Sequence, residues 1–321
     1  MASRAKRITT SLPPCGNDSP RRRGPHLTFV VLAALSAISA HAANDAPSRS
    51  PGYQIVAHDD SAITYRIADD LAARLAPLFE DARAGQARRR PTFTVTIGPA
   101  ALRKAVARRC DCVIVAAYTS SQVFHEIVGG LPAAQARAIT AVYAEPAPAD
   151  QLRLADLLYR RPVRAAAIVG PGSAFLKPEL AADRVVVVDA DGARMGEVLE
   201  RIAQTDVLLA LPDRAIYNPD SFRSILLATY RHKQGVIGFS SDMVRAGALA
   251  TTYSEIEDID AQVTEVAAAY VDGGALAPPR FPRYFRTAIN DGVARSLDIA
   301  VGDDARRFAS RPAQPAARRT P

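Results

Sequence analysis

Short apolar runs alternate with longer amphipathic segments along most of this chain, and that alternation most constrains its fold. CVIVAA (112–117) and DVLLAL (206–211) are two of the apolar runs, and residues 63–78 place apolar side chains at helical spacing. Strands that alternate with helices of ten or more residues form βαβ units and parallel sheets. The roughly ten strands fall into two series on either side of the proline-rich link 145–148. The sequence therefore predicts an α/β protein with two lobes, parallel sheets flanked by helices and a ligand cleft between the lobes.

The expected elements follow from where the apolar runs and the helical spacings begin and end. A continuous apolar run such as 112–117 is typical of a strand buried on both faces of a parallel sheet. Strands are expected at 53–57, 93–97, 112–117, 138–143, 163–169, 184–188, 206–211, 235–239 and 283–289, and helices at 63–79, 100–109, 121–128, 150–159, 192–204, 221–232, 255–272 and 290–297.

The amino terminus has the pattern of an export signal. An uncharged run of 14 residues (27–40) follows three arginines at 21–23 and overlaps the small-x-small sequence Ala-His-Ala at 40–42. These features are typical of a secretory signal peptide, and the run is too short to cross a bilayer as a helix. The alternative, a buried core helix, agrees less well with the polar, proline-rich stretch that follows. The sequence predicts a signal peptide over 1–42, a periplasmic protein and no membrane span after cleavage.

The charge of the chain belongs mostly to that leader. The chain has 40 Lys and Arg residues against 33 Asp and Glu residues, a formal net charge of +7. Residues 1–42 carry six of the basic residues and one of the acidic ones, so the net charge beyond residue 42 is +2. The basicity is therefore no sign of a nucleic-acid partner. The segment 310–321, rich in Pro, Ala and Arg, is expected to be a disordered basic tail.

The three cysteines are too few for a disulfide scaffold or a four-cysteine zinc site. Cys15 precedes the apolar run, whereas a lipid-attachment cysteine would follow it. Cys110 and Cys112 could pair in an oxidising compartment, but the ring would hold eleven atoms and be strained. The favoured expectation is two buried, small side chains at the start of a strand.

Several expected strands end in polar or turn-rich segments. In open α/β sheets, ligands bind at the carboxyl ends of the strands, and facing lobes would bring such segments to one cleft. Taken singly, Thr119, Ser173 and Ser240 can be explained as parts of helix caps. Asp213 is expected at the cleft rim, where its carboxylate can pair with a ligand's ammonium group, although an ordinary turn is the alternative. The segments are 118–121, 145–146, 172–173, 212–213 and 240–242.

The carboxyl-terminal half resembles the periplasmic substrate-binding components of ABC transporters, in the branch that includes tryptophan/tyrosine-type binding proteins. Residues 53–140 agree with that family mainly in the order of their elements. The family often has Asp-Pro where this chain has Glu145-Pro146, and the segment 297–299 lacks the usual Gly. The matching segments are VYAEPAPADQLRL (142–154), IVGPGS (168–173), DVLLALPD (206–213), GVIGFSSDMVRAGALA (235–250) and INDGVARSLDI (289–299).

The resemblance implies the two-lobed type I periplasmic-binding-protein fold. The first lobe would comprise 43–145 and about 250–283, and the second 146–249 and about 284–309. The implied function is the capture of a small, amino-acid-like molecule by lobe closure, with an inner-membrane ABC permease as partner and no cofactor. The implied ligand-binding residues are Thr119, Ser120, Glu145, Ser173, Asp213, Ser240 and Tyr253.

The sequence offers little for catalysis, and neither a catalytic residue nor a metal site is predicted. His125-Glu126 lacks the second histidine of a zinc-protease helix, because residue 129 is Gly. Gly238-Phe239-Ser240 lacks the closing glycine of a nucleophile elbow. One alternative function is a periplasmic sensory or envelope-assembly protein that reuses the binding fold. A hydrolase using Ser240 and His232 is a weaker one, because His232 precedes the strand that Ser240 follows.

Overall fold

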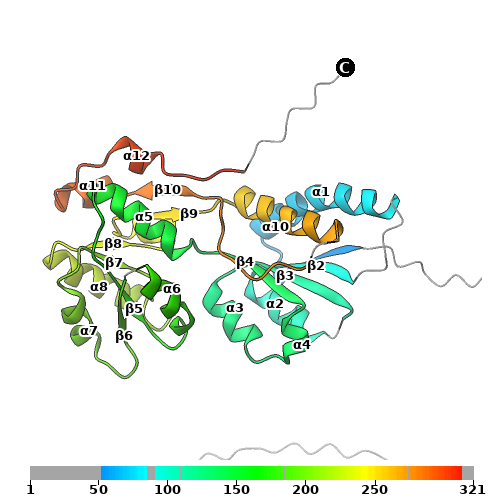
Figure 1. Ribbon diagram of the computed structural model, residues 1–321, viewed down its shortest axis with the longest axis horizontal. Helices are drawn as coiled ribbons and strands as arrows, with labels where there is room; N and C mark the ends of the chain where they lie inside the picture. Colours follow the sequence, from blue (N-terminus) through cyan, green and yellow to red (C-terminus); the bar gives the residue numbers. More distant parts are fainter. Residues whose placement is uncertain (1–51, 85–90, 109, 184, 274, 313–321) are drawn as a thin grey trace, which may run out of the picture. The chain divides into compact units, whose positions relative to one another are not determined.

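The computed structural model describes residues 52–84, 91–108, 110–183, 185–273 and 275–312 (Figure 1). The predicted signal peptide at 1–42 and residues 313–321 of the predicted tail lie outside the described residues. Within residues 48–321 the strands form one four-stranded sheet and one six-stranded sheet.

The first sheet is fully parallel, with the strand order β1-β2-β3-β4. Alternate residues of β3 and β4 point into two separate apolar clusters, one on each face of the sheet, and β2 contributes apolar residues to one of them. Helices α1 and α10 cover one face, and α2 and α3 cover the other (Figure 1). The elements are β1 (Tyr53–Val56), α1 (Ala62–Ala84), β2 (Thr92–Ile97), α2 (Gly98–Ala107), β3 (Cys112–Thr119), α3 (Ser121–Val128), α4 (Ala133–Ala136), β4 (Ile139–Tyr143) and α10 (Ile256–Val271).

The second sheet has the order β10-β9-β8-β7-β5-β6 and is parallel except for its edge strand β10, which runs antiparallel to β9. Helices α5, α6, α11 and α12 contribute to the apolar cluster on one face, and α7, α8 and α9 to that on the other. The elements are α5 (Pro148–Tyr159), β5 (Ala165–Val169), η1 (Ala174–Leu176), α6 (Lys177–Ala182), β6 (Val186–Asp189), α7 (Met195–Ile202), β7 (Val207–Leu209), α8 (Pro219–Arg231), β8 (Gly235–Ile237), α9 (Ser241–Arg245), β9 (Ala250–Tyr253), β10 (Arg286–Ile289), α11 (Asp291–Ser296) and α12 (Asp303–Arg306).

Side-chain caps explain where several helices begin, because the first backbone N–H groups of a helix lack partners inside it. The Ser120 side chain accepts a hydrogen bond from the Val123 N–H at the start of α3. Asn218 does the same for the Ser221 N–H at the start of α8. The predicted α/β class, with parallel sheets flanked by helices, is confirmed.

One strand falls elsewhere than predicted. Strand β9 pairs with β8 and β10 and belongs to the second sheet, although the segment from about 250 was expected in the first lobe. Its Thr251 and Thr252 are buried without an apolar run, and Gln151 of α5 donates to the Thr251 hydroxyl and accepts from the Thr252 N–H. The chain packs against the first sheet in α10, where Val263 and Tyr270 enter the apolar cluster, and it returns to the second sheet at β10.

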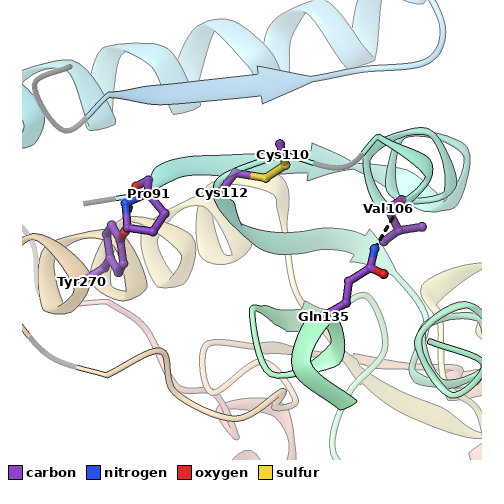
Figure 2. Close-up of a disulfide and its surroundings, with 6 residues drawn as sticks. All are labelled: Pro91, Val106, Cys110, Cys112, Gln135 and Tyr270. Carbon is purple, nitrogen blue, oxygen red and sulfur yellow. Dashed lines mark hydrogen bonds between the residues drawn. A yellow bond between two sulfur atoms is a disulfide. The ribbon is translucent and has the colours of Figure 1, made fainter. Parts of the chain in front are cut away.

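The expectation of two buried, unpaired cysteines is wrong. Cys110 and Cys112 form a disulfide, Cys110 is exposed and Cys112 is half-buried (Figure 2). Apolar burial in β3 begins only at Ile114, so Cys110 lies before the strand and Cys112 is its half-buried first residue. The predicted tail also begins later than expected, because Ser310 and Phe285 exchange two backbone hydrogen bonds.

None of the helices in the described part of the chain is long and apolar enough to cross a membrane.

Candidate functional site

The candidate site is built on the loops that follow β3 and β4 of the first sheet and β5 and β7 of the second. The loop after β3 leads into α3, whose amino-terminal N–H groups have two caps. Ser120 accepts from Val123 N–H, and the Glu145 carboxylate accepts from Ser121 N–H at 2.9 and 3.1 Å. A carboxylate at this position is also stabilised by the helix dipole. Glu145 and Ser120 are thereby placed together at one helix end.

Glu145 and Thr119 are buried, with 4% and 1% of their surfaces exposed. Burial raises the pKa of Glu145, and the hydrogen bonds from Ser121 act in the opposite direction. The Ala144 N–H donates to the Thr119 carbonyl at 3.1 Å, which ties the ends of β3 and β4 together. Both predicted residues therefore have structural tasks at the carboxyl edge of the first sheet.

On the second sheet, Ser173 and Asp213 are in direct contact. The Ser173 hydroxyl donates to Asp213 Oδ2 at 2.8 Å and accepts from Gly170 N–H at 3.1 Å. Asp213 Oδ1 accepts from Ala215 N–H at 3.0 Å. Asp213 is 1% exposed, so its carboxylate is buried rather than open at a rim as the sequence analysis expects. The loop after β5, which carries Ser173, covers it.

Gln122 of α3 connects the two sheets at this point, and the sequence analysis did not single it out. Its amide Nε2 donates to Asp213 Oδ1 at 3.4 Å, and its Oε1 accepts from Arg214 N–H at 3.3 Å. The ring of His125, one turn further along α3, stacks on Phe175 with the ring centroids 3.9 Å apart. The sequence gives no signal for Gln122, because a polar residue at a solvent-facing position of a short helix is indistinguishable by pattern from any other such residue.

Asp213 is buried without a cationic partner. No ion pair among the described residues includes it, and its hydrogen-bond donors, Ser173, Gln122 and Ala215, are all neutral. Burial, and secondarily the charge of Asp213, raise the pKa of Tyr217. A buried carboxylate with neutral donors only is a favourable place for an incoming cation.

Ser240 and Tyr253 have no hydrogen bond to the Ser173–Asp213 pair within the described residues. Ser240 caps α9 by accepting from Met243 N–H, and Tyr253 ends β9 beside Arg286 of β10. Ser240 follows β8 whereas His232 precedes it, so a strand lies between the two residues that a serine hydrolase would need side by side. The structure thus gives Ser240 the capping role that the sequence analysis left open.

A separate apolar cavity of about 560 Å³ lies between α8 and α9. Tyr217, Phe222, Phe239 and Met243 are among its lining residues, and none of the seven predicted site residues lines it. It is a second place where a small molecule could be accommodated. No group of three or more metal-ligating side chains is found in the described part of the chain.

Replacing Gly170 by alanine is expected to lower the free energy of unfolding by about 1–3 kcal/mol, because a Cβ there would lie 2.8 Å from Asp213 Oδ2. The matched control is Gly196→Ala in α7, where a Cβ meets no atom within 4 Å and stability should rise by up to about 1 kcal/mol, because alanine favours a helix more than glycine does. Urea unfolding followed by circular dichroism measures both. Equal stabilities of the two variants would contradict the close packing of Gly170 on Asp213.

Beside the site, Tyr118 links the end of β3 to α10. Its hydroxyl donates to Asp260 Oδ1 at 2.6 Å, and Asp260 is fully buried. The pKa of Asp260 is raised to about 7; burial is the largest cause and Asp70 adds to it, whereas Tyr118 and Arg74 act in the opposite direction. Between pH 4 and 7 the folded protein therefore holds a proton that the unfolded chain has lost.

The free energy of unfolding should consequently fall as the pH rises through this range. Asp260→Asn removes this titration. The free energy of unfolding of the variant minus that of the unmodified protein should therefore be higher at pH 8 than at pH 5 by about 2–3 kcal/mol. Urea unfolding of both proteins at the two pH values tests this. If the stability difference is the same at pH 5 and pH 8, Asp260 does not titrate with a raised pKa in the folded protein.

Comparison with known proteins supports the fold. No protein-family model matches the chain, and neither does any curated protein. The ligand-free, open structure of a substrate-binding protein with adhesive properties from Clostridium difficile has a TM-score of 0.53 at 13% identity, covering 81% of this chain and 99% of that one. This similarity confirms the predicted two-lobed binding-protein fold.

Two further solved structures are similar over nearly the same range. The ABC domain in complex with L-Trp from Streptococcus pneumoniae has a TM-score of 0.49 at 13% identity, covering 81% of this chain and 99% of that one. A periplasmic ribose ABC transporter protein from Conexibacter woesei has a TM-score of 0.36 at 14% identity, covering 80% of this chain and 99% of that one.

Proposed function

We propose that this chain is the exported, periplasmic solute-binding component of an ABC-type import system. Its ligand is a small, amine-bearing molecule of the amino-acid type, which binds between the loops of the two sheets. The observation that carries the proposal is Asp213, a buried carboxylate with neutral donors only, at the point where Gln122 of the first sheet meets the second. The segments that resemble such binding proteins, and in particular their tryptophan/tyrosine-type branch, include this aspartate.

In the proposed mechanism, the ligand's ammonium group replaces the Gln122 amide at Asp213. The Gln122 contact is long, at 3.4 Å, so its loss costs little compared with a charge-assisted hydrogen bond. A ligand that contacts both sheets shifts the hinge equilibrium towards the closed state, because it binds that state more tightly. The closed protein then docks on an inner-membrane permease, and no covalent chemistry or cofactor is involved.

Thr119, Ser120, Glu145, Ser240 and Tyr253 take supporting roles in this proposal. Ser120 and Glu145 hold the amino terminus of α3 and so position Gln122. Ser240 and Tyr253, at the ends of β8 and β9, are proposed to contact the bound ligand.

A thermal-shift screen of the purified chain tests the proposal. The panel contains the proteinogenic amino acids, their N-acetyl derivatives and common monosaccharides. We expect at least one amino acid to raise the melting temperature in a saturable manner, and its N-acetyl derivative to have no effect because it lacks the ammonium group. If only sugars or N-acetyl compounds stabilise the protein, or if no compound does, the proposed ligand class is wrong.

A further inference from the structure

The Cys110–Cys112 disulfide lies at the opposite edge of the first sheet from the candidate site. Cys112 begins β3, whereas Thr119 and Ser120 follow its other end. A cavity of about 440 Å³ opens beside the disulfide and is lined by both cysteines and by Arg108, Asp111 and Gln135, among others. Cys110 is exposed. The disulfide is therefore accessible to a molecule that approaches from solvent.

The surrounding structure is held in place without the disulfide. The Thr92 N–H donates to the Asp111 carbonyl at 3.1 Å, which fixes the residue between the two cysteines. Gln135 Nε2 donates to the Val106 carbonyl at 2.8 Å and joins α4 to α2, and the Tyr270 hydroxyl donates to the Pro91 carbonyl at 2.8 Å (Figure 2). These contacts surround the sulfur atoms but do not include them.

A disulfide between residues separated by one position adds little stability of the usual kind. Disulfide stabilisation grows with the length of the chain segment that the bond closes, and here only one residue lies between the two cysteines. Arg108 lines the same cavity, and a nearby cation favours the thiolate form of a reduced cysteine. The position combines exposure, a neighbouring cavity and a cation, which are features of an exchangeable disulfide rather than of a structural one.

We propose that Cys110–Cys112 is a redox-active disulfide, which a dithiol reduces while the protein remains folded. A thiolate of the dithiol attacks Cys110 Sγ, the Cys110–Cys112 bond breaks, and Cys112 leaves as a thiolate that takes a proton from water. The second thiolate of the dithiol then attacks the dithiol's first sulfur atom, which is bonded to Cys110 in the mixed disulfide. Cys110 leaves as a thiolate and also takes a proton from water. Two electrons and two protons pass to the protein, and the dithiol becomes a disulfide.

Alkylation of the native protein with and without dithiothreitol tests this proposal. All variants carry Cys15→Ser, because residue 15 would also react. With about 1 mM dithiothreitol, both cysteines should be labelled within minutes in intact-mass spectra, while the circular dichroism spectrum stays unchanged. The proposal is overturned if labelling requires denaturant, if reduction unfolds the protein, or if both cysteines are already free thiols in the air-exposed protein.

Two single variants test which sulfur is attacked. Cys112→Ser leaves the exposed Cys110, and Cys110→Ser leaves the half-buried Cys112. The thiol in Cys112→Ser should react with an aromatic disulfide reagent at least about tenfold faster than the thiol in Cys110→Ser. Equal rates, or the reverse order, would overturn the assignment of Cys110 as the attacked sulfur. These readouts do not depend on solute binding.

Discussion

Replacing Asp213 by asparagine should weaken binding of the amine-bearing ligand by about 30-fold or more, because removing the charge of one partner of a buried charge pair typically costs about 2–5 kcal/mol. Asparagine keeps the size of the side chain and an oxygen that can accept from Ala215 and Gln122. Its amide nitrogen would take the place of Asp213 Oδ2 and can donate to the Ser173 hydroxyl, which contacts that atom. The loss should therefore lie in affinity, measured by titration calorimetry with the amino acid that the screen identifies.

The matched control is Asp298→Asn, at an exposed aspartate outside the candidate segments that pairs with Lys233. This variant should bind the same ligand with unchanged affinity. Asp213→Ala is a poorer test, because it would leave the buried Ser173 hydroxyl without its acceptor and lower stability as well. An affinity of Asp213→Asn equal to that of the unmodified protein would remove Asp213 from the ligand site.

Replacing Phe93 by alanine should lower the free energy of unfolding by about 3–5 kcal/mol. Phe93 is fully buried in β2, and its ring lies 5.6 Å from that of Phe79 and 5.4 Å from that of Tyr270, between centroids. Phe79 belongs to α1 and Tyr270 to α10. The substitution therefore opens a cavity where β2 meets the two helices that cover this face of the first sheet. Urea unfolding followed by circular dichroism measures the loss.

The control for Phe93 is Ile63→Ala, because Ile63 is 58% exposed at the start of α1. Its stability should change by about 0.5 kcal/mol or less. If Phe93→Ala is as stable as Ile63→Ala, the apolar cluster does not hold α1 and α10 on the first sheet. The assignment of Phe93 to the core of the first sheet would also be contradicted if Phe93→Ala destabilised only the second sheet.

The elements that could be predicted are those with a strong local signal. Helix α3 has the predicted bounds, since Ser120 and the apolar spacing mark its start and its course. Strand β7 is shorter than the apolar run that predicted it, covering Val207–Leu209 only. Strand β9 could not be predicted, because its buried threonines depend on hydrogen bonds to Gln151, about a hundred residues away.

The sequence predicts polar site residues at the strand ends but not the contacts between them, and their role in ligand binding stays a prediction. Polar side chains at the ends of β3, β5 and β7 follow from the strand pattern, and the structure joins Ser173 to Asp213 as neighbouring loops require. Asp213 also accepts a hydrogen bond from Gln122, which lies 91 residues earlier in the chain. A contact of that kind leaves no trace in the sequence near either residue.

Hydrogen–deuterium exchange with and without the amino acid found in the screen tests the central claim most directly. If the ligand binds between the two sheets, peptides that cover 121–128, 170–176 and 211–217 should be protected together, because α3 and the two loops meet at Asp213. Protection confined to α8 and α9 would place the ligand in the apolar cavity of the second sheet instead. That result would contradict a ligand held jointly by both sheets.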